Sequence, residues 1–552
     1  MVDTTKRFTD DIRNVVIKLG YNILGNAKFE DIIKAGVEEI EHLIQLGILK
    51  PELDSNGKQS KVSYKLDEWV DKYYPIINRR VDDSKDNGYR FGKLDENGEE
   101  SSFTFKPYVK ATYLFNQSNQ PKNIYNILRK QNKIAYEVWG RVLLHKRTNK
   151  SNVYDNQFKI ETRAMKDAVR IMRNKGDHLT IYFGHQYDKR GRLYNDGYLL
   201  NYQGDEWSKA AIRPIIAPQK LTDRGLLAMR IDLANHFGYD KLTYQERLDA
   251  DCSNLAKAKK PILATRAKEF LGEAIKTNQT DYVCAIDATA SGMQILSILA
   301  NCSETAKATN LTDISNCYDI YGIACEKIIA KTGMSKISIK DIRDIVKKAL
   351  MTRGYNSDKQ VQVAHIALKR FKINISINEL KKILDISQKI TACKDAMNNL
   401  LCDTFSNLPN DKQIIRYTMP DGFIVEFPNV IKQMEKIRVS NENLWMRYDA
   451  LGWNKELNWR ALSPNLVHSI DAYICREIIR RCNFEVITIH DSFSCHPNNI
   501  DKLRLTYIQL LKEIQQMNIL NYIGKQLNSS FSWQPEGELF DIAESIDSYC
   551  IC

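Results

Sequence analysis

The sequence predicts an α+β fold. Four short runs rich in β-branched and aromatic residues are typical of strands, at 179–183, 282–286, 422–427 and 484–489. Long amphipathic segments lie between them, with apolar residues three and four positions apart as in helices. Because the strands are far apart in the chain and helical segments separate them, we expect an α+β core with helical insertions.

The composition is that of a globular protein. Of the 552 residues, 43% are hydrophobic and 27% charged, which excludes a disordered or fibrous chain. No apolar run approaches the roughly 20 residues of a membrane span, and the charged N-terminus lacks the apolar stretch of a secretion signal. The net charge of +12 is compatible with a polyanionic partner and equally with an ordinary mixed-charge surface.

The twelve cysteines are scattered along the chain and form no Cys-x-x-Cys pair. Zinc-finger spacing is therefore absent. Since we find no secretion signal, we expect reduced and mostly buried thiols.

The N-terminal region shows helical periodicity through the first fifty residues, and a helical, basic pattern returns at about 120–176. Two polar stretches between them, 53–61 and 82–102, are rich in Gly, Asn, Asp and Ser. We interpret both stretches as surface loops or linkers.

Two aspartates follow strand-like runs. Asp287 ends one run and precedes a turn of small residues that leads into a predicted helix. Asp491 lies in the segment His490-Asp491-Ser492, at the tip of a predicted hairpin. Each aspartate could hold a metal ion, and each alone is explained as well by a helix cap or a polar turn.

A cationic helix is predicted between the two aspartates. Arg343, Lys347, Met351 and Tyr355 are four residues apart, and four residues turn a helix by about 400°, so they share one face. Together with Lys348, the cations fit the phosphates of a nucleoside triphosphate, and the tyrosine fits its sugar and base. A surface helix with a basic face is the alternative.

Two carboxylates and a cationic helix are the groups that two-metal phosphoryl transfer requires. Two Mg²⁺ ions held by Asp287 and Asp491 would activate a 3′-hydroxyl and stabilise the leaving pyrophosphate. Mg²⁺ uses few protein carboxylates alongside substrate phosphates, so two aspartates suffice. A lysine at the phosphate end would neutralise or protonate the leaving group.

These residues resemble the motifs of the phage-type, single-subunit DNA-dependent RNA polymerases, a family that includes mitochondrial enzymes. Residues 287–294 are similar to its motif A, 343–355 to motif B and 490–493 to motif C. Further segments match in the same order, namely 188–194, 418–423, 464–469 and the acidic-aromatic tail 537–552. The resemblance covers about 180–552.

The resemblance implies a DNA-directed RNA polymerase that uses NTPs in transcription. Asp287 and Asp491 would hold the two Mg²⁺ ions, and Lys347 would be the general acid or main triphosphate contact. Tyr355 and His468 would recognise the ribose 2′-hydroxyl, which a site with matched polar groups can discriminate strongly. The other implied roles are nucleotide binding for Arg343 and Lys348, and template or hybrid binding for Arg190, Arg192, Tyr194 and His490.

The resemblance also implies a right-hand fold of palm, fingers and thumb with a small, mostly helical N-terminal domain. We expect a reduced N-terminal domain at 1–105, a helical thumb region at 106–179, palm at 180–305 and 468–552, and fingers at 306–467. The tryptophans of 438–460 fit either a specificity loop or core.

The chain departs from the family pattern at two points. Asn356 stands where the family usually has glycine, which puts the pocket for the templating base in doubt. About 187 residues precede the segment at 188–194, fewer than in the well-known phage enzymes, which use this region to recognise and melt promoters. We therefore expect a need for single-stranded or pre-melted template, or for an accessory initiation protein.

Two other functions would fit part of these motifs. A primer-synthesising or family-A-like DNA polymerase would share the chemistry, but Ser492 follows Asp491 where such an enzyme has glutamate, and His468 is present. A polymerase-derived binding protein without activity conflicts with the intact Asp287, Lys347 and Asp491. We expect the cytoplasm of a phage-infected host cell, with an organelle as the alternative and no membrane partner.

Overall fold

The computed structural model contains helices and strands interspersed along the chain, so the predicted α+β class is confirmed. The residues that it describes are 7–11, 16, 29–45, 49–52, 61–65, 78–83, 88–94, 100–109, 119–148, 155–174, 180–197, 200–332, 339–354, 377–390, 395–406, 414–439, 442–451, 455–535 and 537–552. They fall into two compact units. Unit 1 comprises Met1–Lys189, Tyr194–Ile215 and Glu426–Asn454, and unit 2 comprises Arg190–Leu193, Ile216–Val425 and Lys455–Cys552.

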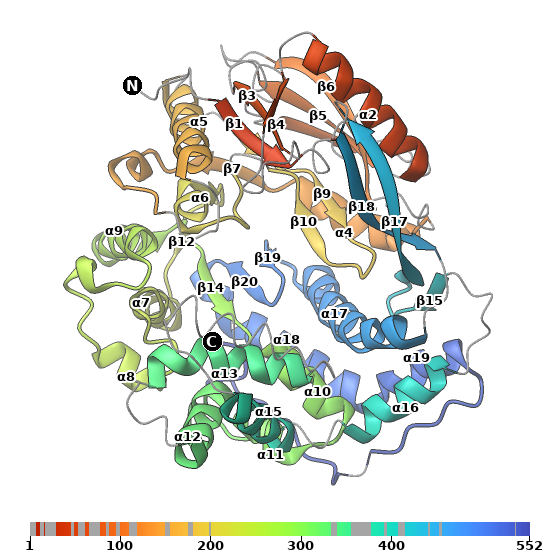
Figure 1. The fold of residues 1–552 in the computed structure, drawn as a ribbon. Coiled ribbons are helices and arrows are strands. Elements are labelled where there is room, and N and C mark those ends of the chain that lie inside the picture. The colour runs from red at the N-terminus through yellow and green to blue at the C-terminus, as the bar shows by residue number, and fades with distance from the viewer. Residues whose placement is uncertain are drawn as a thin grey trace. The chain divides into compact units, whose positions relative to one another are not determined.

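Unit 1 is built from small antiparallel sheets and a few helices (Figure 1). Three sheets have the orders β1-β3-β2, β4-β5-β6 and β11-β7-β8, and β17 pairs with β18 in a long hairpin. Its elements are β1 (Arg7–Asp11), α2 (Phe29–Gln45), β2 (Leu49–Glu52), β3 (Lys61–Lys65), β4 (Asn78–Asp83), β5 (Gly88–Leu94), β6 (Glu100–Pro107), α4 (Lys122–Asn132), β7 (Ala135–Val138), the 3₁₀ turn Gly140–Leu144, α5 (Asp155–Asn174), β8 (Ile181–Tyr182), β9 (His185–Tyr187), α6 (Glu206–Ala211), β11 (Ile212–Pro214), β17 (Val430–Val439) and β18 (Glu442–Leu451). Two strands, β10 (Leu193–Asn195) and β16 (Ile424–Pro428), cross the boundary between the units.

The described residues of the N-terminal region are mostly in strands, contrary to our expectation of a mostly helical domain. Its described residues form six strands, β1 to β6, together with helix α2. The stretch 82–102, which we interpreted as a loop, contains the end of β4, all of β5 and the start of β6. β5 and β6 pair antiparallel, with a register shift at Lys93 and Leu94. Aromatic residues alternate with polar ones in both strands, a strand pattern that the Gly, Asn and Asp content concealed.

Unit 2 contains the sheet β14-β20-β19 and most of the long helices. Its elements are β12 (Gln219–Lys220), α7 (Asp223–Phe237), α8 (Tyr244–Asp249), the 3₁₀ turn Leu255–Lys257, α9 (Pro261–Thr277), β13 (Gln279–Thr280), β14 (Cys284–Asp287), α10 (Ser291–Leu299), α11 (Ser303–Ala308), α12 (Ile320–Thr332), α13 (Ile339–Gly354), α15 (Ile377–Ile390), α16 (Asp395–Ser406), β15 (Ile414–Thr418), α17 (Lys455–Arg481), β19 (Ile487–Ile489), β20 (Ser492–Cys495), the 3₁₀ turn Pro497–Asn499, α18 (Ile500–Gln516) and α19 (Ile519–Leu527).

The core of unit 2 lies around this sheet. Ile286 and Phe493 are buried partners on β14 and β20, and helix α10 packs against both α17 and α18. All four strand-like runs of the sequence form strands, namely β8, β14, β16 and β19. Short apolar runs predicted these strands because burial of their side chains is what the sheet requires.

The cysteines mostly match the expectation. Among the cysteines that the structure describes, nine are thiols, and most of these are buried. Cys302 is in a disulfide, contrary to our expectation of reduced thiols.

A buried arginine ties the segment 190–193 to helix α17. The Arg476 guanidinium donates to the Asp421 carboxylate at 2.5 and 3.1 Å and to the Gly191 carbonyl at 3.0 Å, and it stacks on the Phe423 ring at 4.4 Å. Gly191 has a φ of +85°, and a Cβ atom there would lie 2.2 Å from Nη1 of Arg476. Glycine is therefore required in this segment both by its backbone angle and by the guanidinium.

We predict that Arg476→Ala destabilises the protein by about 3–5 kcal/mol, because it leaves Asp421 as a buried charge without its partner. Chemical unfolding of the full chain measures the change. The control is Arg480→Ala on the same helix, whose half-exposed side chain pairs with Glu477 and should cost about 1 kcal/mol or less. Equal losses for the two variants would contradict this account of the arginine.

Candidate active site

Asp287 lies at the end of β14, where the strand passes into the turn before α10. β14 pairs with β20 in antiparallel register, and Asp287 stands opposite Ser492. The turn contains Ala290 in the left-handed conformation, with a φ of +57°. The small residues of this turn, which were visible in the sequence, allow the abrupt change from strand to helix.

Asp491 lies in the two-residue turn of the β19–β20 hairpin, as predicted. His490 precedes it with a φ of +57°, a value suited to tight hairpin turns. The Ser291 hydroxyl donates to the Asp491 carboxylate at 2.8 Å, and the Ala288 N–H donates to the Asp491 carbonyl at 3.0 Å. The two aspartates, about two hundred residues apart in the chain, are thereby held side by side.

The negative charges of the Asp287 and Asp491 carboxylates repel each other. The pKa of Asp287 is raised from 3.8 to about 7. The larger cause is that surrounding protein atoms reduce the hydration of the carboxylate, although the residue is still exposed to solvent. The second cause is the charge of Asp491. The charges of Lys241 and Lys260 oppose this rise in part. A cation near the two carboxylates would stabilise their ionised forms and so lower the pKa of Asp287.

The C-terminus of the chain covers the outer edge of β14. The backbone of Cys552 exchanges two hydrogen bonds with the backbone of Asp287, both 3.1 Å long, and Ile551 bridges to Ala288. The Thr289 N–H donates to the Cys550 carbonyl at 2.9 Å. Figure 1 shows this end of the chain beside β14. The sequence indicated only that this tail resembles that of the family.

Sequence reasoning missed a charged loop between α7 and α8. Gly238 ends α7 with a φ of +99°, and Thr243 begins α8 with a capping box to Glu246. Between these two caps lie Asp240 and Lys241, whose side chains pair at 3.3 Å. No apolar periodicity marks such a loop, and its caps were the available signal.

The charges of this loop act on both halves of the site. Lys241 of this loop and Lys260, which lies just before α9, oppose the rise in the pKa of Asp287, and both lysine residues are exposed. Hydrogen bonding to Asp319 and the charges of Asp319 and Asp240 raise the pKa of Arg343 above its ordinary value. The carboxylate pair and the cationic helix therefore share one electrostatic neighbourhood.

The cationic row on α13 lies on one helical face, as predicted. Arg343 and Lys347 lie over the Tyr321 ring, at 5.1 and 5.2 Å from its centre, and the Tyr321 hydroxyl donates to the Met351 sulfur at 3.5 Å. Arg343 also forms two 2.9 Å hydrogen bonds with Asp319. The sequence pattern missed Tyr321 and Asp319, which lie on and just before α12 and orient the row.

The end of this row is only partly described. Lys347 and Lys348 are exposed on α13. Tyr355 and Asn356 lie outside the described residues, so their predicted roles stay predictions.

Arg190 and Arg192, two of the predicted template residues, each donate a hydrogen bond to a side chain of α17. Arg190 donates to Nδ1 of His468 at 2.8 Å, which leaves the ring proton on Nε2 because an arginine can only donate. Arg192 donates to Asp471 at 2.8 Å. Burial and the charge of Asp491 raise the pKa of Asp471 to about 6, and Arg192 opposes this rise.

The remaining predicted residues are placed as follows. His490 is half-buried beside Asp491 in unit 2, and Tyr194 is half-buried on β10 in unit 1. The segment 438–460, which fits either a specificity loop or core, overlaps the β17–β18 hairpin and the start of α17 at Lys455. Its role stays a prediction.

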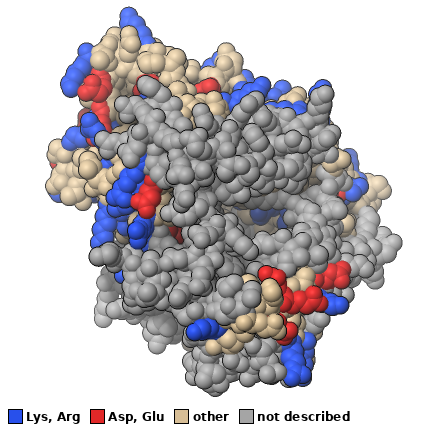
Figure 2. Space-filling model, turned by 90° about the horizontal axis from the view of Figure 1, so that it is seen from above, with Lys and Arg blue, Asp and Glu red and all other residues tan. Residues whose placement is uncertain are grey.

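This hairpin carries exposed basic and apolar side chains on one face. Met434, Lys436, Arg438 and Trp445 are exposed, and Lys436 stands opposite Trp445. The exposure of Trp445 favours the surface interpretation over core. Seen from above, the described surface of the molecule carries Lys and Arg in several separate groups (Figure 2).

The carboxylate pair fits Mg²⁺ by its donor set. Among the described residues, no group of three or more His, Cys, Asp or Glu side chains is placed to hold a metal, which argues against a zinc-type site there. Mg²⁺ needs only one or two protein carboxylates when a substrate supplies phosphate oxygens. The charge of Asp491 helps to raise the pKa of Asp287. A divalent cation bound between the two carboxylates would relieve this repulsion.

The fold and the site together define a class: an α+β protein whose paired aspartates and cationic helix suit a divalent cation and a polyphosphate. Residues 255–539, just over half of the 552, match the family described as DNA-dependent RNA polymerase. The chain therefore belongs to this family, in its phage-type, single-subunit branch.

Three relatives illustrate the similarity. A probable DNA-directed RNA polymerase of Neurospora crassa is 27% identical over 388 residues, which are 58% of this chain and 42% of the relative. The chloroplastic DNA-directed RNA polymerase 3 of Nicotiana sylvestris is 23% identical over 439 residues, 68% of this chain and 44% of the relative. The mitochondrial DNA-directed RNA polymerase 1 of Arabidopsis thaliana is 21% identical over 447 residues, with shares of 69% and 45%. The chain spans about half the length of the relatives that it matches.

In the part of the chain that the structure describes, no helix is both long and apolar enough to cross a bilayer.

We predict that Asp287→Asn stabilises the metal-free protein above pH 7 and not near pH 4. The folded-state pKa of about 7 lies above the ordinary 3.8, so the folded protein holds a proton that the unfolded chain has lost between these values. Stability of the wild type therefore falls as pH rises through this window. Thermal unfolding at pH 4, 6 and 8 in EDTA measures the difference.

The control for this prediction is Asp249→Asn, which removes an exposed carboxylate from the end of α8. A pH-independent gain for Asp287→Asn, or the same gain for both variants, would show that the aspartate pair carries no strain.

Proposed function

We propose that the chain is a DNA-directed RNA polymerase that joins NTPs on a DNA template. The observation that carries the proposal is the pairing of β14 with β20, which brings Asp287 next to Asp491 in the unit that also contains the cationic helix α13. Membership of the polymerase family supports it. The names of the relatives state the same activity for those proteins.

The carboxylates of Asp287 and Asp491 would hold two Mg²⁺ ions, and Ser291 fixes the rotamer of Asp491 by its 2.8 Å hydrogen bond. When bound, the two ions supply activation of the 3′-hydroxyl and charge stabilisation of the leaving pyrophosphate. The protein's own contribution is to hold two mutually repelling carboxylates ready, so that little reorganisation is needed.

The α13 row would bind the triphosphate. Lys347 is exposed with its ammonium group over the Tyr321 ring, which restricts the lysine without neutralising it. From this position it would meet the β- and γ-phosphates and donate a proton to the pyrophosphate. Arg343 is already paired with Asp319, so it would attract the triphosphate less strongly than an unpaired arginine. Lys348 would assist it.

His468 would recognise the ribose. Arg190 keeps its Nδ1 occupied as an acceptor, so Nε2–H is the donor that a 2′-hydroxyl oxygen can use. Tyr355 would assist, as the family resemblance implies. Arg192, which is bound to Asp471, would support the template through the backbone of its own segment.

We also propose the right-hand architecture and its domain limits given above, with DNA template, nascent RNA and NTPs as partners. A need for an accessory initiation protein or a pre-melted template is part of this proposal. Two relatives are named for chloroplast and mitochondrion, which raises an organelle to equal standing with a phage-infected cell.

We predict that Asp287→Asn and Asp491→Asn each lower RNA extension by at least about 10²-fold, since each removes a carboxylate on which the metals depend. Primer extension on an RNA–DNA hybrid with NTPs and Mg²⁺ measures this. Asp249→Asn is the matched control and keeps wild-type activity. Full activity in either active-site variant refutes the metal assignment.

The same assay separates the alternatives for the wild-type chain. Parallel reactions contain NTPs or dNTPs, and single-stranded, bubble or closed duplex templates. The proposal expects NTP use on single-stranded and bubble templates. Preference for dNTPs would identify a DNA polymerase, and specific initiation on closed linear duplex would remove the need for an accessory protein.

A further inference from the structure

The strand that carries Asp287 is an outer strand of its sheet. The order is β14-β20-β19, so one edge of β14 has no strand of this sheet beside it among the residues that the structure describes. Successive backbone N–H groups of a strand point to opposite edges, and Ala285 and Asp287 therefore both point to this outer edge. A buried N–H group needs an acceptor, so the outer edge of β14 must find acceptors elsewhere.

Two different groups supply these acceptors. The Asp287 N–H donates to the carbonyl of Cys552, and the Ala285 N–H donates to the carboxylate of Asp232 at 3.1 Å. Asp232 lies on α7, which packs directly against β14. A side-chain carboxylate thus occupies a place where a neighbouring strand would offer a carbonyl.

Asp232 is itself held in place. It is 3% exposed, its Oδ2 accepts the Tyr282 hydroxyl at 2.7 Å, and Nε2 of His236 lies 3.5 Å away. Burial would raise the pKa of Asp232, but His236 and the donors from Tyr282 and Ala285 outweigh burial and lower it. The carboxylate therefore stays ionised and accepts on both oxygens, which makes its hydrogen bonds charge-assisted.

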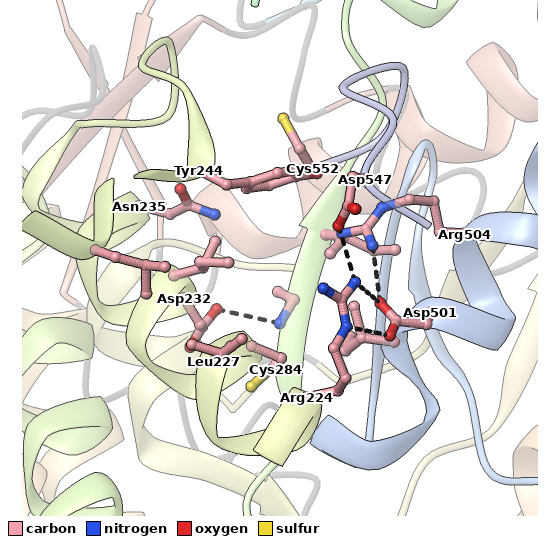
Figure 3. Close-up of a pocket in the computed structure, with 16 residues that line it drawn as sticks. Arg224, Leu227, Asp232, Asn235, Tyr244, Cys284, Asp501, Arg504, Asp547 and Cys552 are labelled. Atoms are coloured by element: carbon pink, nitrogen blue, oxygen red, sulfur yellow. Dashed lines mark hydrogen bonds and ion pairs between the residues drawn. The ribbon is translucent and has the colours of Figure 1, made fainter. Parts of the chain in front are cut away.

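A cavity of about 70 Å³ lies beside this contact, lined by residues of α7, β14, α18 and the C-terminal tail. Figure 3 shows the Asp232 carboxylate pointing at the backbone of β14, while Arg224 points at Asp501. The Arg224 guanidinium is engaged by Asp501 and Asp547, so it does not draw Asp232 away from the strand. Without the carboxylate, the Ala285 N–H would face this hollow.

We propose that Asp232 is a positioning residue for nucleotidyl transfer. By accepting the Ala285 N–H, it fixes the outer edge of β14 two residues before Asp287 and so sets where that carboxylate meets Asp491. This inference rests on the proposed function. A displacement of about 1 Å in a reacting group can cost about 10²-fold in rate, so a contact far from the substrate can matter.

The experiment compares Asp232→Leu with Asp232→Asn in the full chain. Leucine keeps the approximate shape and has no acceptor, whereas asparagine keeps an acceptor oxygen without the charge. Three quantities are measured: deuterium exchange of the peptide that contains 284–289, affinity for Mn²⁺ by electron paramagnetic resonance without nucleotide, and kcat and KM for NTP in primer extension. Far-UV circular dichroism checks folding.

For Asp232→Leu we expect faster exchange at Ala285, Mn²⁺ affinity reduced severalfold, and kcat reduced about 10–100-fold with KM for NTP within about twofold. For Asp232→Asn we expect the exchange rate, the Mn²⁺ affinity and kcat to stay near their wild-type values. Wild-type exchange and Mn²⁺ affinity in Asp232→Leu overturn the proposal. An Asp232→Asn variant as impaired as Asp232→Leu overturns it too, because charge and not acceptance would then be decisive.

If Asp232→Leu does not fold, the variant Tyr282→Phe is measured in its place to test the proposal. It removes one of the hydrogen bonds that orient the carboxylate and leaves the acceptor for Ala285 in place. Faster exchange of 284–289 with weaker Mn²⁺ binding supports the proposal, and no change in either overturns it. A wild-type chain that extends no RNA refutes the proposed function, while the exchange and Mn²⁺ measurements still judge Asp232.

Discussion

The constraint on which the site depends is the antiparallel pairing of β14 with β20. It places Asp287 opposite Ser492 and therefore next to Asp491, which puts two like charges together in partly desolvated surroundings. Folding must hold this repulsion in place without a metal, and the hydrogen bond from Ser291 to Asp491 is one of the interactions that do so. The catalytic role that we propose for the site and its cost in stability have the same origin.

The rest of unit 2 can be understood as support for that pairing. The C-terminal residues and Asp232 close the open edge of β14, and the loop with Lys241 reduces the repulsion at Asp287. At the proposed triphosphate site, the Tyr321 ring lies under both Arg343 and Lys347 of α13. These groups come from α7, α12 and the chain end, so the site draws on most of the unit's length.

Local patterns in the sequence predicted the strands that end at the aspartates, the hairpin at Asp491 and the shared face of Arg343 and Lys347. Each of these is decided by residues close together in the chain. Partners that come from afar were missed, among them Asp319, Lys241 and Asp232, because spacing along the chain carries no record of such contacts. The strands β4 to β6 were missed for another reason, since their Gly and Asp content is also that of loops.

The central claim is that Asp287 and Asp491 hold metal ions jointly. The most direct measurement is anomalous diffraction from crystals of the protein soaked in Mn²⁺ with template, primer and a non-hydrolysable NTP. The account predicts two manganese peaks between the aspartates, with carboxylate oxygens of both residues at about 2.1 Å, the distance typical of Mg²⁺. Peaks elsewhere, or metal bound to one aspartate with the other turned away, would contradict it.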